Sequence, residues 1–272
     1  MDIRLLGPLE ADERGVSLIP TARKPRQLLA LLVLNLDQVV SVDACVEELW
    51  DDEPPTSMAA TLQTYILQIR RRLAKLPRLG SLQAARTVLE TRGNGYVFRT
   101  TTDDEYDVLR FEQNVQAARV ALARDDSLTG ACLLRDALEL WRGPALAGTP
   151  AGPLVRARLV GLEESRLTAL EQRIEADLRL GRHHELLGEL TSLVAGHPVL
   201  ENLHAQLMLA LYRSGRPAQA LGVYDRLRGS LDRELGIEPS QRLRRLHRAV
   251  LSADPALDPP HPATFPLSLG LV

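Results

Sequence analysis

Short β-prone stretches open the chain, and longer runs with helical spacing of apolar residues follow them. Residues 3–10 and 16–20 are rich in isoleucine, leucine and valine and are separated by Arg14-Gly15, a turn signal. The pattern predicts a small antiparallel sheet at the N-terminus.

Three helical segments come next. The first begins at about Pro25, and the second follows Ser41, whose side chain suits an N-cap. After the acidic, proline-broken connection 51–55, a third helix is predicted from about Ser57 to Leu76. Two further β-prone runs flank a turn of glycine and asparagine at 93–95, which predicts a hairpin over 87–99. Three helices followed by a hairpin are typical of a winged helix-turn-helix, whose third helix enters the major groove of DNA.

The third helix separates into two faces when residues are placed at 100° intervals. One face is apolar: Leu62, Tyr65, Ile66, Ile69, Leu73 and Leu76. The opposite face mixes cations with amides and hydroxyls, together with Leu67: Thr61, Gln63, Thr64, Gln68, Arg70, Arg71, Arg72 and Lys75.

Charge is distributed unevenly along the chain. The 272 residues carry a net charge of −2, which is not typical of a nucleic-acid-binding protein. However, no acidic residue occurs between Glu53 and Glu90, where six basic residues lie. Such a run is by itself more typical of a solvated helix face, so it supports DNA binding only in combination with the winged-helix layout.

The second half reads as helical from Glu105 to about Ala253, with breaks at glycine and proline clusters. Gly181-Arg182 recurs as Gly215-Arg216, 34 positions later, which is the tetratricopeptide period. We therefore predict a mainly α protein with a small β component: a winged helix over 1–100 and a tetratricopeptide-like helical domain over 105–253. Residues 254–272 are rich in proline and are expected to be a disordered tail.

A series of short motifs runs in order along nearly the whole chain. They are Leu5 to Leu9, Lys24 to Leu32, Glu48 to Trp50 with Pro54-Pro55, Thr61 to Leu73, Gly93 to Tyr96, Ala137 to Gly143, Glu163 to Asp177, Gly215 to Leu221 and Glu234 to Pro239. In this order they resemble the Streptomyces antibiotic regulatory protein family, whose small members join an OmpR-type winged helix to a bacterial transcriptional activation domain.

The resemblance implies an activator of a secondary-metabolite (antibiotic) biosynthetic cluster. It implies binding to direct repeats near the promoter −35 region, with two protomers side by side on the double-stranded DNA, and recruitment of RNA polymerase holoenzyme. We expect a cytoplasmic, nucleoid-associated protein, because the start of the sequence has no signal-peptide pattern and no apolar stretch is long enough to span a membrane.

Roles for the candidate DNA-binding residues follow from side-chain chemistry. Arginine pairs with guanine and glutamine with adenine, while threonine methyl groups contact thymine, so Thr64, Gln68 and Arg71 are the expected base readers. The other polar residues of that face, Thr61, Gln63, Arg70, Arg72 and Lys75, complete the predicted interface, the cations mainly on phosphates.

Three flanking groups complete the candidate site. Arg92 and Asn94 at the hairpin tip are expected to touch DNA as a wing, although a hairpin tip is polar in any case. Three cations at the start of the first helix are expected to hold phosphates: Arg23, Lys24 and Arg26. In OmpR-type proteins, the turn corresponding to Asp51, Asp52 and Glu53 can touch polymerase, and here a simply solvated turn fits these acids at least as well.

The sequence offers little for catalysis. There is no GxxxxGK[ST] loop for ATP, no histidine or cysteine spacing typical of a metal site, and no recognisable nucleophile, so we expect no enzyme activity, cofactor or metal. A rival hypothesis from another class is a tetratricopeptide-type adaptor that does not bind specific DNA.

Overall fold

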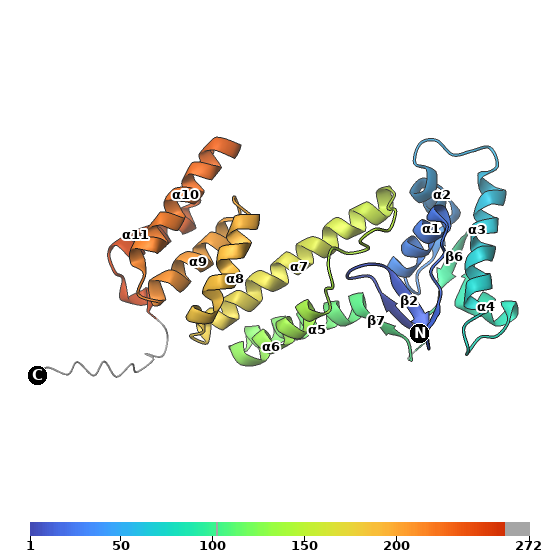
Figure 1. Cartoon of the computed structure of the whole chain (residues 1–272), viewed down its shortest axis with the longest axis horizontal. Helices are drawn as coiled ribbons and strands as arrows, with labels where there is room; N and C mark the ends of the chain where they lie inside the picture. The colour runs from blue at the N-terminus through green and yellow to red at the C-terminus, as the bar shows by residue number, and fades with distance from the viewer. Residues whose placement is uncertain (102, 259–272) are drawn as a thin grey trace, which may run out of the picture. The chain divides into compact units, whose positions relative to one another are not determined.

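The computed structural model describes residues 1–101 and 103–258, and these form two compact units (Figure 1). The first unit contains Met1–Asn114 and Asp136–Leu167, and the second contains Val115–Arg135 and the residues from Thr168 onward. The first unit therefore includes residues well beyond position 100. The predicted division of the sequence at 100–105 stays a prediction.

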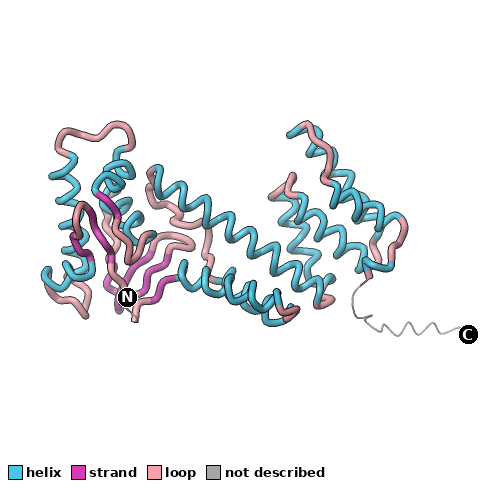
Figure 2. Tube along the Cα trace, turned by 180° about the vertical axis from the view of Figure 1, so that it is seen from behind, coloured by secondary structure: helices cyan, strands magenta, loops and turns pink. Residues whose placement is uncertain are grey.

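Within the described residues, the first unit contains seven strands in two sheets (magenta in Figure 2). A four-stranded sheet has the order β3-β2-β1-β7, formed by β1 (Asp2–Arg4), β2 (Glu10–Glu13), β3 (Val16–Ser17) and β7 (Glu105–Tyr106). Antiparallel pairing of β1 with β2 and of β2 with β3 confirms the predicted N-terminal sheet. The parallel pairing of β1 with β7 was not predicted, because the two strands are about 100 positions apart in sequence.

The winged helix-turn-helix is present as predicted. Its elements are α1 (Arg23–Leu34), β4 (Val40–Ser41), α2 (Val42–Trp50), α3 (Met58–Leu73), β5 (Leu89–Thr91) and β6 (Gly95–Phe98), with the three strands in the order β4-β6-β5. Ser41 is the N-cap of α2, and its Oγ accepts a hydrogen bond from the Ala44 amide at 3.0 Å. The apolar faces of the three helices and the inner residues of the hairpin form one core.

One helix in this unit was missed. Residues Leu82–Val88 form α4, capped by Ser81, whereas the sequence suggested that the strand begins at Thr87. The β-branched residues Thr87 and Val88 have high strand propensity, but here they continue the helix, and β5 begins one residue later. Packing of α4 against α3 decides the local structure over propensity.

Two buried carboxylates fasten later parts of the chain to the winged helix. Asp107, at the start of α5 (Asp107–Ala123), accepts hydrogen bonds from the Leu5 and Leu6 amides at 2.8–2.9 Å. Glu48 of α2 is 1% exposed and accepts from the Val155 amide at 3.0 Å and from the Gly152 amide, at the start of α7 (Pro153–Arg179). Both carboxylates thus accept hydrogen bonds from buried backbone amides of the first unit, which would otherwise lack a partner.

The second unit is helical. Parts of α5, α6 (Ser127–Glu139) and α7 belong to it, followed by α8 (His183–Gly196), α9 (Glu201–Arg213), α10 (Pro217–Leu235) and α11 (Gln241–Leu251). The predicted repeat is visible in the backbone, because Gly181 and Gly215 both adopt positive φ (78° and 72°) just before α8 and α10. These helices confirm the predicted fold class, mainly α with a small β component.

The predicted tail differs at its start. Pro255–Leu257 forms a 3-10 helix (η1), and Arg213 donates from Nε to the Leu257 carbonyl at 2.8 Å. The rest of the predicted tail, 259–272, lies outside the described residues.

Candidate nucleic-acid interface

The two predicted faces of α3 are found in the structure. Leu62, Ile66, Ile69 and Leu73 are buried, and half-buried Tyr65 stacks on Trp50 with 6.3 Å between ring centroids. The exposed side chains of the opposite face are Gln63, Thr64, Leu67, Gln68, Arg71 and Lys75. The helix therefore uses its apolar face for the core and presents a polar face to solvent.

The three predicted base readers share that exposed face. Within the described residues, neither Gln68 nor Arg71 makes a side-chain hydrogen bond or ion pair. The Thr64 hydroxyl donates to the Ala60 carbonyl at 2.9 Å, which leaves its methyl group and hydroxyl lone pairs free. An amide and a guanidinium with free donors are the groups that read base edges.

Arg70 is placed differently from its neighbours. Its guanidinium donates to the Leu89 carbonyl from Nε and Nη2 at 2.9 and 2.8 Å and to Thr91 Oγ1 at 2.8 Å, so it joins α3 to the hairpin. Burial lowers the pKa of this guanidinium, aided by the positive charge of Arg86 and opposed by Tyr96. These contacts tie Arg70 to the wing, and the phosphate contact suggested by the sequence stays a prediction.

The remaining residues of the predicted recognition helix lie around its edge. Arg72 and Thr61 are half-exposed, while Gln63 and Lys75 are exposed. Thr61 Oγ1 lies 3.4 Å from the Ser57 hydroxyl at the start of the helix. The helix ends at Leu73 rather than at the predicted Leu76, so Lys75 lies just beyond its end.

The wing tip is a tight turn that presents Arg92 and Asn94 to solvent. The Arg92 amide donates to the Gly95 carbonyl at 3.0 Å, and the Asn94 carbonyl accepts from the Val42 amide at 2.9 Å. Gly95 itself has no room for a side chain, because a Cβ there would lie 2.4 Å from the Val40 carbonyl oxygen. Backbone contacts therefore fix the tip and leave its two polar side chains exposed.

The three cations at the start of α1 differ in their contacts and exposure. Lys24 donates to the Leu49 carbonyl near the end of α2 and lies 5.8 Å from the Trp50 ring centroid. Burial and the charge of Arg23 lower the Lys24 pKa, against a smaller opposing effect of Glu48. Arg26 donates from Nε to the Pro20 carbonyl at 3.0 Å. Only Arg23 is exposed, so it is the member of the three best placed to meet a phosphate.

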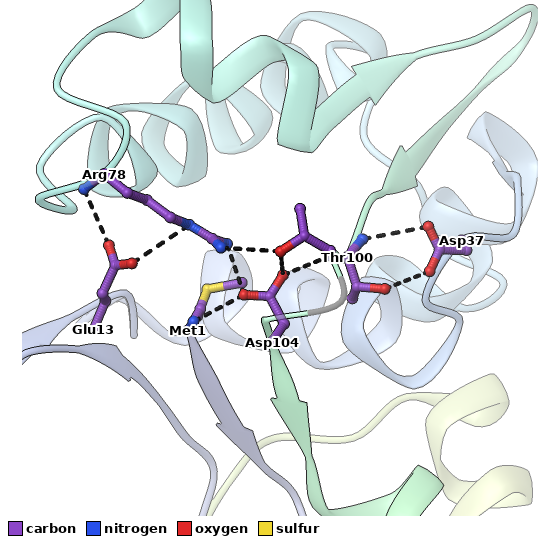
Figure 3. Close-up of polar contacts among 7 residues, drawn as sticks. Met1, Glu13, Asp37, Arg78, Thr100 and Asp104 are labelled. Carbon is purple, nitrogen blue, oxygen red and sulfur yellow. Dashed lines mark hydrogen bonds and ion pairs between the residues drawn. The ribbon is translucent and has the colours of Figure 1, made fainter.

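Arg78, the fifth cation of the basic run, is bound inside the first unit (Figure 3). Its guanidinium lies 2.8 Å from Asp104 and 3.5 Å from Glu13, and the Asp104 side chain is 1% exposed. Burial alone would raise the pKa of Asp104, but the N-terminal ammonium, the Thr101 amide and Arg78 outweigh it and lower that pKa. Arg78 is therefore structural, and the basic run is smaller at the surface than in the sequence.

The acidic residues between α2 and α3 are all exposed. Asp51, with φ of 56°, turns the chain, and Asp52 and Glu53 follow it. Figure 1 shows that this loop projects beyond the ends of both helices. It is accessible to a partner protein without any rearrangement of the helices.

Residues 1–101 and 103–258 were also searched for a metal site, a reactive thiol and a membrane-spanning helix. No group of histidine, cysteine and acidic residues there has the geometry to hold a metal ion. Burial, followed by the charge of Glu48, raises the pKa of the Cys45 thiol to about 12, which keeps it protonated. In the same part of the chain, no helix combines the length and apolar character needed to cross a membrane.

Comparisons with known proteins agree on the class of protein. Residues 16–98 match the family described as the C-terminal part of transcriptional regulatory proteins, and residues 106–251 match the bacterial transcriptional activator domain. The regulatory protein DnrI of Streptomyces peucetius is 46% identical over 99% of this chain and 100% of its own length. The regulatory protein AfsR of Streptomyces coelicolor is 39% identical over 93% of this chain but 24% of its own length.

A solved structure of Mycobacterium tuberculosis EmbR, in complex with a low affinity phosphopeptide, has a similar fold. The match has a TM-score of 0.85 and 32% identity, and covers 93% of this chain and 65% of that one. This likeness confirms the predicted winged helix followed by a helical domain. The relatives are named as regulatory proteins, in agreement with the prediction that the chain is not an enzyme.

Proposed function

Because the chain belongs to the Streptomyces antibiotic regulatory protein family of transcriptional regulators, we propose that it is a sequence-specific DNA-binding activator of a secondary-metabolite (antibiotic) biosynthetic cluster. One observation carries the proposal. The exposed face of α3 holds an amide and a guanidinium, Gln68 and Arg71, without side-chain partners in the described part of the chain. Free donors of these two kinds on a winged-helix recognition helix are suited to base edges.

In this proposal α3 enters the major groove. Arg71 donates both arms of its guanidinium to guanine O6 and N7, Gln68 pairs with adenine, and the Thr64 methyl group contacts thymine. Arg72 and Lys75, at the edge of the same face, neutralise phosphates and add affinity without sequence preference. The apolar face of α3 stays packed throughout, so no refolding is required.

The hairpin and α1 set the register. Arg92 and Asn94 reach the adjacent minor groove or backbone, and Arg70 holds the hairpin at a fixed place relative to α3. Arg23 adds a phosphate contact at the start of α1. Lys24, Arg26 and Arg78 support this arrangement through contacts within the first unit.

Residues 1–100 carry a net charge of about +1, so one protomer has few cations for DNA. Two protomers bound side by side on direct repeats near the −35 region compensate for this weak electrostatic attraction through cooperativity. The exposed acidic loop, Asp51 to Glu53, is placed to contact RNA polymerase holoenzyme. The protein then acts at the nucleoid in the cytoplasm.

The proposal is tested by a gel-shift titration of the purified chain. The probes are promoter fragments from its own genomic neighbourhood, with random competitor DNA, at several salt concentrations. We expect shifts that survive the competitor, appear stepwise or cooperatively, and weaken steeply as salt rises. A transcription assay with purified RNA polymerase holoenzyme and the same fragments then separates an activator from a protein that only binds.

A tetratricopeptide-type adaptor is the second candidate, supported by the repeated geometry before α8 and α10. It predicts that no shift survives the competitor at low salt, in the gel shift or with polymerase present. Such a result would leave the helical repeats as the functional surface and would contradict the activator.

A further inference from the structure

A second basic surface lies on α11, outside the winged helix. The exposed side chains between Gln241 and Arg248 are one glutamine and four arginines: Gln241, Arg242, Arg244, Arg245 and Arg248. Leu243 and Val250 are buried on the opposite face. No acidic residue occurs from Gln241 to Ala253. We refer to the four arginines as the α11 arginine face.

These guanidiniums lack acidic partners. None of the four forms an ion pair within the described residues. One of them makes a side-chain hydrogen bond there, since Arg242 Nη1 donates to Asn202 Oδ1 at 3.4 Å. Other arginines of the same unit are engaged, since Arg173 and Arg182 both pair with Asp177. The α11 arginine face is therefore free to bind an external anion.

This arrangement costs helix stability. Arg244 and Arg248 are four positions apart and Arg242 and Arg245 three apart, so like charges adjoin on the helix surface and repel. Arg242 also lies in the first turn, where the helix dipole disfavours positive charge. Uncompensated repulsion of this kind is expected where a ligand supplies the negative charge.

The local packing holds part of this face in place. The ring of His247 stacks on Tyr224, with 4.0 Å between centroids and 19° between planes. Together with Gln241, these rings and two arginines, Arg244 and Arg248, line a shallow hollow of about 380 Å³. The stacked rings and both arginines therefore line the same hollow.

We propose that the α11 arginine face binds the phosphodiester backbone of duplex DNA, as a second contact that rests on the proposed DNA-binding function. The axis between Arg242 and Arg248 is about 9 Å long, over which duplex DNA carries roughly five negative charges. Arginine forks bind phosphate oxygens in pairs. A protein partner fits less well, because the exposed side chains of this stretch include none of the apolar or aromatic anchors that centre protein interfaces.

The test compares the full chain with R244Q/R245Q/R248Q on a 60-base-pair duplex of mixed sequence, followed by fluorescence anisotropy between 50 and 200 mM salt. Each phosphate contact contributes about 0.9 to the slope of log affinity against log salt. The variant should therefore show a slope shallower by about two to three, and binding at 50 mM salt weakened by about tenfold or more. Mixed sequence is chosen because backbone contacts need no operator.

The matched control is R119Q/R124Q/R216Q, three exposed arginines of the second unit that also form no ion pair within the described residues. It should bind as the wild type does. Circular dichroism should show the same helix content in all three proteins, because removal of like-charge repulsion does not weaken α11.

Two outcomes would overturn the proposal. In the first, the α11 variant equals the wild type in slope and affinity, and if it also loses activation with purified polymerase, α11 is assigned to a protein partner. In the second, the control weakens binding as much as the α11 variant does, so the effect is not specific to α11. Failure of the wild type itself to bind the duplex would instead contradict the proposed function, and the α11 contact with it.

Discussion

The helices α3 and α11 are both amphipathic and contain no acidic residue, yet their exposed faces differ in kind. The face of α3 mixes arginine with glutamine and threonine, whereas that of α11 is almost entirely arginine. Amides and hydroxyls distinguish bases, and guanidiniums alone mainly recognise phosphate. The difference indicates that α3 is suited to reading sequence and α11 to binding any duplex.

Their arginines also differ in how they are held. In α3, Arg70 is tied to the hairpin while Arg71 is free, although the two are adjacent in sequence. In α11, all four arginines are free of ion pairs within the described residues. Adjacent residues of one type thus have separate roles in α3, and substitutions there should have separate effects.

The largest combined effect is expected at Arg70, where both folding stability and DNA binding should change. Replacement by alanine removes hydrogen bonds from a charged donor to the Leu89 carbonyl and the Thr91 hydroxyl, which we expect to cost about 2 kcal/mol of unfolding free energy. Operator affinity should also fall because the wing is no longer held. Urea unfolding and gel shifts measure the two effects, and R70K should restore little, since an ammonium cannot reproduce the fork. Unchanged stability in R70A would show that Arg70 is not a positioning residue.

Arg71→Ala should leave folding unchanged and cost about 1 to 3 kcal/mol of specific binding. The loss arises from one bidentate contact to a guanine, so preference should relax at one base step only. Titrations against operators substituted at single positions measure this. If R71A kept both affinity and preference, α3 would not lie in the groove as proposed.

The carboxylate that holds Arg78 gives the stability of the first unit a pH dependence. The pKa of Asp104 is lower in the folded chain than in the unfolded one, so its stabilisation is complete above the unfolded value of about 3.9. It is lost as pH falls through the lower folded value. Urea midpoints from pH 7 to 3 should therefore decline less steeply in D104N than in the wild type.

D104N should also be less stable at pH 7, by about 1 to 3 kcal/mol, because the N-terminal ammonium and Arg78 lose their buried partner. Parallel acid profiles for the two proteins would mean that Asp104 does not titrate with a lowered pKa.

The smallest effect is expected at Lys75, which is exposed just beyond the end of α3. Its replacement by alanine should weaken binding to all sequences alike and reduce the salt slope by about one. Salt titrations on operator and mixed-sequence duplexes measure this. A change of base preference in K75A would remove the distinction between base readers and phosphate contacts in α3.

Much of the fold could be predicted from the sequence because its signals are local. The N-cap Ser41 and the turn before Gly95 are short-range features, and the faces of α3 follow from helical spacing. The separation of 34 positions between Gly181 and Gly215 likewise revealed the helical repeat. Exposure of Gln68 and Arg71 follows from the same periodicity, so the face proposed to read bases could be predicted from the sequence.

The hydrogen-bond partners of individual cations could not be predicted from the sequence. Lys24 donates to the Leu49 carbonyl and Arg70 to the Leu89 carbonyl. Backbone acceptors of this kind leave no pattern in the sequence. The role of Glu48 was hidden for the same reason, since two of its partners are backbone amides about 100 positions away. Periodicity identifies which side chains point away from a helix, but not whether a long side chain returns to another part of the chain.

The most direct test of the central claim is selection of bound sequences from a randomised duplex library. The wild type, R71A and R244Q/R245Q/R248Q would be selected in parallel at one salt concentration. Our account predicts that the wild type enriches a direct repeat, that the α11 variant enriches the same repeat with weaker binding, and that R71A loses preference at one position of each half. Failure of the wild type to enrich any motif, or a changed motif in the α11 variant, would contradict the assignment of sequence reading to α3.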